Sequence, residues 1–86
     1  MSVYANFSSN EASTSGTATV TFPWKARQIT ITNDSAVHSL EYKFNTSEDY
    51  GTLLPTETLA LHHHARDVIL NSPSGNSVAY RVWGYG

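Results

Sequence analysis

Apolar and polar residues alternate along most of the chain between Ala18 and Trp83. A period of two places successive side chains on opposite faces of an extended strand, so each such stretch is expected to bury one face and expose the other. The alternation predicts six strands, at 17–22, 27–32, 38–45, 56–62, 66–71 and 77–83. Their spacing is typical of an all-β sandwich, and no window has the period of an amphipathic helix.

Turn-forming residues separate these predicted strands. Pro23 is expected to end the first strand because proline has no N–H to donate to a neighbouring strand. Short polar residues at 33–35 favour a turn, and 46–51 is predicted to be a polar loop. The clearest turn is 72–76, which combines a proline with a glycine that is free to adopt positive φ.

The first sixteen residues differ from the rest of the chain. Residues 8–16 contain no large apolar side chain, so we expect 1–16 to form an extended N-terminal arm outside a sandwich domain at 17–86. Val3, Tyr4 and Phe7 are the apolar anchors of this arm, and they either dock on a neighbouring molecule or belong to a frayed terminus.

Length and charge limit what the chain can do. With 86 residues and no cysteine, it has one small core and no disulfide, so we expect it to gain stability by forming a homotrimer or another symmetric homo-oligomer. A net charge of −2 with only 14% charged residues provides no basic surface for nucleic acid. The longest apolar runs are too short to cross a bilayer, and the first residues do not resemble a secretion signal.

Three consecutive histidines, His62, His63 and His64, form the most conspicuous local motif. On an extended chain His62 and His64 point to one side and His63 to the other. We expect an exposed strand end and no cofactor; the alternative is a structural metal site in which pairs of His62 and His64 meet on a threefold axis. A catalytic metal is disfavoured because the sequence supplies no further ligand.

No other constellation resembles an active site. Serines, His38, Asp34 and Asp67 are present, but no nucleophile-bearing turn brings such groups together. Glu48 and Asp49 lie in a polar loop, where solvation is expected rather than acid–base catalysis. The sequence therefore predicts a protein that is not an enzyme.

Aromatic residues instead suggest a binding surface. If Tyr80 and Val82 face the core, then Arg81, Trp83 and Tyr85 face outward, and Trp, Tyr and Arg are the residues that dominate interface hot spots. Alternatives are that this strand is buried on both faces, that Trp83 closes the end of the core, or that exposed aromatics stack on carbohydrate. The predicted interface comprises Val3, Tyr4, Phe7, Trp24, Arg81, Trp83 and Tyr85.

Several segments together resemble a protein family. These are Ile-Thr-Ile-Thr-Asn-Asp at 29–34, Leu-Pro-Thr-Glu-Thr-Leu at 54–59, a Ser/Gly turn, and Arg-Val-Trp-Gly at 81–84. From residue 17 onward this layout resembles small bacteriophage virion proteins. The resemblance implies a jelly-roll sandwich in the virion that binds the major capsid protein or other virion proteins, as a decoration or cement protein, and it brings no catalytic residues. A tail, spike or fibre component and a carbohydrate-binding module are the alternatives.

Overall fold

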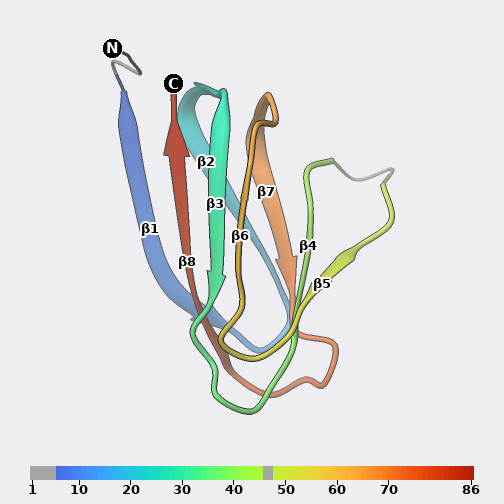
Figure 1. Cartoon of the computed structure of the whole chain (residues 1–86). Helices are drawn as coiled ribbons and strands as arrows, with labels where there is room; N and C mark the ends of the chain where they lie inside the picture. The colour runs from blue at the N-terminus through green and yellow to red at the C-terminus, as the bar shows by residue number, and fades with distance from the viewer. Residues whose placement is uncertain (1–5, 46–47) are drawn as a thin grey trace.

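In the part of the chain that the structure describes, eight strands make up the regular structure (Figure 1). The computed structural model describes residues 6–45 and 48–86, and none of these forms a helix long and apolar enough to cross a membrane. The strands are β1 (Phe7–Thr14), β2 (Thr17–Ala26), β3 (Gln28–Asn33), β4 (Leu40–Lys43), β5 (Gly51–Leu53), β6 (Thr58–Leu61), β7 (Ala65–Asn71) and β8 (Val78–Tyr85).

The strands form two four-stranded antiparallel sheets that face each other. One sheet has the order β1-β8-β3-β6 and the other β2-β7-β4-β5. Each sheet therefore joins strands from the beginning, middle and end of the chain, as in a jelly roll. The prediction of an all-β, jelly-roll-like sandwich is confirmed.

The core lies between the sheets and follows the predicted alternation. Tyr80 and Val82 of β8 are buried, and so are Ile29 and Ile31 of β3, which belong to the same sheet. The opposing sheet contributes Val20, Phe22, Leu40, Leu53, Val68 and Leu70. These apolar side chains fill the space between the sheets, and Tyr42, Phe44 and Leu59 pack against them while partly exposed.

The N-terminal segment differs from our expectation. It is extended, but Phe7–Thr14 forms strand β1 and pairs with β8 without interruption, from Phe7↔Tyr85 to Thr14↔Val78. Sequence alternation missed this strand because neither of its faces carries a large apolar residue after Phe7. Residues 7–14 thus belong to the sheet rather than to an arm outside it.

Pro23 does not end the second strand. β2 continues to Ala26, although its register with β7 is broken between Thr21 and Ala26. In this gap the guanidinium of Arg66 binds backbone carbonyl groups of β2. Nε donates to the carbonyl of Phe22 at 3.0 Å, and Nη2 donates to that of Pro23 at 3.2 Å. A side chain thereby satisfies carbonyl groups that the interrupted ladder leaves open.

Other boundaries also differ. β4 (Leu40–Lys43) is shorter at both ends than the predicted 38–45, β6 (Thr58–Leu61) is shorter than the predicted 56–62, and β5 (Gly51–Leu53) begins where a loop was expected. The turn at 72–76 is confirmed: Gly75 has φ of 78°, its N–H donates to the carbonyl of Ser72, and the hydroxyl of Ser72 donates to the carbonyl of Asn76 at 2.6 Å.

Candidate functional site

The outward face of the sheet β1-β8-β3-β6 carries the residues expected to bind a partner. Register decides which side chains share this face, because residues directly opposite each other in a ladder point to the same side. Tyr85 is opposite Phe7 and Gln28, and Trp83 is opposite Ser9 and Thr30. With Tyr80 and Val82 buried, the face contains Phe7, Ser9, Glu11, Ser13, Ala79, Arg81, Trp83, Tyr85, Gln28, Thr30, Thr32, Thr58 and Ala60.

Phe7, Tyr85 and Trp83 form what we call the aromatic row. The rings of Phe7 and Tyr85 lie with their centroids 5.2 Å apart, in a tilted arrangement. Phe7 is 60% exposed, whereas Trp83 and Tyr85 are half-buried. The prediction that Trp83 and Tyr85 point away from the core is confirmed, and Phe7 joins them through β1.

Arg81 continues the row as a fixed cation. Its Nε and Nη2 each donate to one carboxylate oxygen of Asp34 at 2.9 Å, and its guanidinium lies 5.5 Å from the centre of the Trp83 ring. The hydrogen bond to Asp34, followed by the Coulomb attraction of the same carboxylate, raises the pKa of Arg81 further above its usual range. A bidentate pair holds the planar guanidinium in one orientation, so Arg81 presents a positioned cation beside an indole.

Threonines of β3 and β6 lie beside these larger side chains on the same face. Thr30 and Thr32 are buried although they lie on the outward face. The hydroxyl groups of Thr32 and Thr58 are hydrogen-bonded at 3.0 Å. Exposed residues of this face lie on β1 and, at the other edge of the sheet, on β6, whereas Arg81, Trp83 and Tyr85 of β8 are half-buried.

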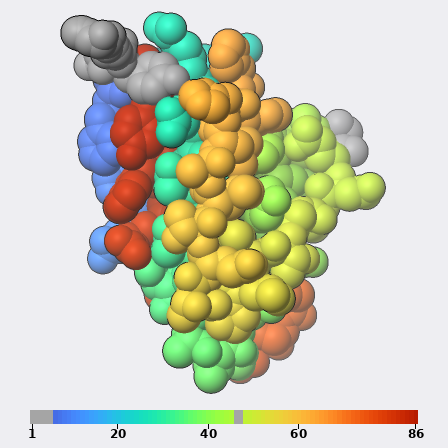
Figure 2. All heavy atoms as spheres, in the orientation of Figure 1, coloured from blue at the N-terminus to red at the C-terminus, as the bar shows by residue number. Residues whose placement is uncertain are grey.

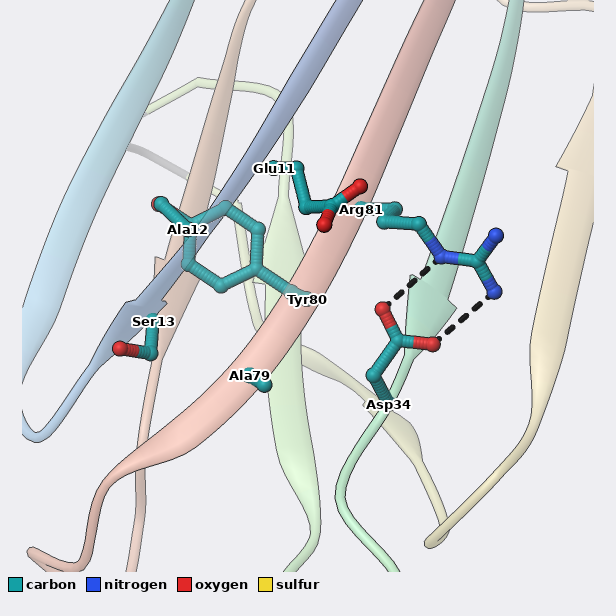
Figure 3. A pocket seen from close by; sticks show the side chains of 7 residues that line it. All are labelled: Glu11, Ala12, Ser13, Asp34, Ala79, Tyr80 and Arg81. Carbon is teal, nitrogen blue, oxygen red and sulfur yellow. Dashed lines mark hydrogen bonds and ion pairs between the residues drawn. The ribbon is translucent and has the colours of Figure 1, made fainter.

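A shallow hollow of about 560 Å³ lies next to the row, over the lower part of β1 and β8 (Figure 3). Glu11 and Arg81 lie at one end, where Figure 3 shows the Arg81–Asp34 pair, and the small side chains of Ser13 and Ala79 lie at the other. Ser13 and Ala79 are opposite each other in the ladder. Because both side chains are small, they leave the space above the strands open.

The other predicted interface residues do not all join this face. Trp24 stacks on buried Phe22, with ring centroids 6.0 Å apart, and packs against the core, so it contributes to the interior rather than to the outward surface. The alternation of Val20, Phe22 and Trp24 contained this signal, because all three fall on one face of β2. Val3 and Tyr4 lie outside the described residues.

The histidine triplet follows β6. His62 and His64 are exposed, and the ring of half-buried His63 lies 4.3 Å from that of Phe44. Among residues 6–45 and 48–86, no three histidine, cysteine, aspartate or glutamate side chains are grouped so that they can hold a metal ion. His63 thus helps to close the core on the side of Phe44.

Tyr80, whose side chain faces the core, is a buried titratable residue among those that line the hollow. It is 5% exposed, and burial raises the pKa of its phenol above the ordinary value of 10.0. The unfolded chain ionises this group at its ordinary pKa while the folded chain keeps it neutral, so its contribution to stability is present below pH 10.0 and is lost as the pH rises further. We expect urea unfolding to show this loss, and Tyr80→Phe to reduce it; an unchanged pH profile in the variant would contradict the assignment.

Comparison with known proteins identifies the fold. No known family matches the chain, and no curated protein does. Among solved structures, a cupin-2 domain of an XRE-family transcriptional regulator from Enterobacter cloacae matches with a TM-score of 0.63 and 18% identity, over 90% of this chain and 78% of that chain. A cupin-2 domain protein from Shewanella frigidimarina matches with a TM-score of 0.61 and 7% identity, over 95% and 72% of the two chains. A cupin superfamily protein from Desulfitobacterium hafniense matches with a TM-score of 0.58 and 10% identity, over 96% and 80%.

These neighbours are cupin proteins rather than virion proteins. At such low identity the likeness concerns the fold alone, and jelly rolls occur in capsid proteins, lectins and cupins alike. The function therefore has to be argued from the surface of this chain.

Proposed function

We propose that the protein is a non-catalytic structural component of a phage virion, a cement or decoration protein that binds between subunits of the major capsid protein. Its attachment surface is the outward face of β8 and β1, centred on Trp83. The observation that carries this proposal is the aromatic row with Arg81 at its end, on the face of β8 and β1 that points away from the opposing sheet. The resemblance of residues 17–86 to small virion proteins supports the choice of partner.

The chemistry of this surface suits adhesion. Trp, Tyr and Arg are enriched among the residues that dominate binding energy, and here β8 presents one of each on the same side. Asp34 already orients the guanidinium of Arg81, so little side-chain freedom remains to be lost on binding. When many copies bind to one closed shell, their binding free energies combine. Each contact can then be weak while the whole layer stays attached.

The central experiment measures binding of the purified chain to particles assembled from the capsid genes of the genome that encodes it. Trp83→Ala should raise the dissociation constant at least ~30-fold, because truncation of a central interface tryptophan costs about 2 kcal/mol or more. Tyr50→Ala is the matched control, since Tyr50 precedes β5 at the edge of the other sheet and should leave binding unchanged.

Circular dichroism separates loss of binding from loss of folding. A Trp83→Ala variant that is folded and binds as well as the parent would contradict attachment through this face. Saturable binding of a glycan by the isolated chain, lost in the same variant, would assign the row to carbohydrate instead. Particles that never take up the parent protein would contradict the cement role itself.

A further inference from the structure

The four edges of the two sheets are unequally protected against pairing with another chain. β5 has three residues and β6 has four, so both are short edges. β2 carries Pro23 and a break in register. β1 has eight residues, unbroken register and a single charged residue, Glu11. Short strands, prolines, irregular register and charges are the usual devices that prevent edge pairing, and β1 lacks nearly all of them.

Hydrogen bonding at the end of β1 shows which backbone groups face away from the sheet. The N–H of Asn6 donates to the carbonyl of Gly86, and the N–H of Gly86 donates to that of Asn6. In an antiparallel ladder hydrogen-bonded pairs alternate with non-bonded pairs. Ser8, Asn10, Ala12 and Thr14 therefore bond to β8, whereas the N–H and C=O groups of Phe7, Ser9, Glu11 and Ser13 point outward from the edge.

We propose that β1 pairs antiparallel with β1 of a second copy of the chain, around a twofold axis at Asn10. The backbone N–H and C=O groups that point outward belong to every second residue of β1. Three central positions for the twofold axis can therefore be compared: Ser9, Asn10 and Glu11. An axis at Asn10 pairs all four outward residues, Phe7 with Ser13 and Ser9 with Glu11, and the neighbouring registers pair only three. An axis at Glu11 also brings two carboxylates directly opposite each other, which is unfavourable.

Side chains on the outward face support the same register. Phe7, at one end of β1, is exposed, and the hollow over Ser13 and Ala79 lies at the other end. Twofold pairing at Asn10 places the Phe7 ring of each copy beside Ser13 of the other, next to that hollow. An isologous interface requires such self-complementarity, in which a patch meets its own counterpart. Figure 2 shows β1, in blue, along one margin of the molecule beside β8, in red, where a second copy has access.

The pairing joins two four-stranded sheets into one of eight strands and produces a closed dimer. The sequence alone favoured a trimer. A twofold contact, however, pairs the β1 edge of each copy with the other, so no β1 edge remains for a third copy. The proposal concerns only contacts between copies and does not depend on which partner the aromatic row binds.

Cysteine cross-linking tests the register directly, because the natural chain has no cysteine. Opposite residues of a non-bonded pair lie ~4.5 Å apart at Cα, within the range that a disulfide spans. Asn10→Cys should form a disulfide-linked dimer in air, since Asn10 would lie opposite its own copy. Ser8→Cys alone and Ala12→Cys alone should remain unlinked, while an equimolar mixture of the two should form the mixed dimer.

Sedimentation of the unmodified chain and of charge variants gives an independent readout. The parent chain should sediment as a dimer of 9.5 kDa protomers. In the dimer, residue 9 of each copy lies opposite Glu11 of the other. Ser9→Glu therefore creates two like-charge pairs and should raise the dimer dissociation constant roughly 2- to 30-fold. Ser9→Glu combined with Glu11→Lys should restore dimerisation. Ala60→Glu, at an exposed position of β6 on the opposite edge of the same sheet, should have no effect.

The proposal fails if the parent chain stays monomeric at micromolar to millimolar concentration. It also fails if Ser8→Cys alone links as readily as Asn10→Cys. A trimer, or a dimer unaffected by the charge of residue 9, would place the contact between copies elsewhere.

Discussion

Phe22→Ala should lower the free energy of unfolding by about 3–5 kcal/mol, the usual cost of truncating a fully buried phenylalanine. Phe22 is completely buried at the centre of the inner face of β2 and stacks on Trp24. A domain of this size has a total stability of only about 5–15 kcal/mol, so the variant should lose a large part of it. Urea or thermal unfolding followed by circular dichroism measures the loss.

Val37→Ala is the control for this experiment, because Val37 is 74% exposed and its truncation should change stability by less than about 0.5 kcal/mol. Gly84 offers a stricter test, since a Cβ atom at this position would lie 2.6 Å from the Phe22 ring. Gly84→Ala should therefore destabilise the parent but be tolerated in the Phe22→Ala background, where the ring is gone. Additive effects of the two substitutions would contradict the packing described for Phe22.

Alternation predicted the strands wherever one face of a strand is apolar and the other polar. It gave the inward positions of β8 correctly, and it placed Arg81, Trp83 and Tyr85 on the opposite face. It missed β1, whose order comes from pairing with β8 rather than from burying a face of its own, and β5, which has only three residues. It ended β2 at Pro23 because it contained no information on Arg66, which bonds across the gap from β7.

The candidate site was predictable only in part for a related reason. The outward direction of Trp83 is a local property of β8, so it follows from sequence. Asp34, which fixes Arg81, is 47 residues away along the chain, and the order of strands brings the two together. Phe7 likewise reaches the aromatic row only through the pairing of β1 with β8. Contacts between distant segments require the topology, which alternation does not specify.

Asn33 lies just before Asp34 and connects that residue to the rest of the fold. It ends β3, is completely buried, and has an amide whose Nδ2 donates to the carbonyl groups of His38 at 2.8 Å and of Leu53 and Leu54 at 3.2 Å. Its Oδ1 accepts from the N–H of Ser35 at 2.9 Å. One side chain thus ties the end of β3 to the segments before β4 and after β5, which lead into the opposing sheet.

Asn33→Ala should therefore lower the free energy of unfolding by about 2–3 kcal/mol, because the buried carbonyl of Leu53 and the partly buried carbonyls of His38 and Leu54 lose their donor, and a buried carbonyl costs about 1–3 kcal/mol when left unpaired. Asn76→Ala is the matched control: Asn76 is exposed and bonds only locally to Ser74 through its side chain, so its loss should cost less than about 0.5 kcal/mol. A loss below about 1 kcal/mol for Asn33→Ala would show that water replaces the amide. In the expected case, loosening of the turn that carries Asp34 should also free Arg81, so binding through the aromatic row should weaken even under conditions in which the variant remains folded.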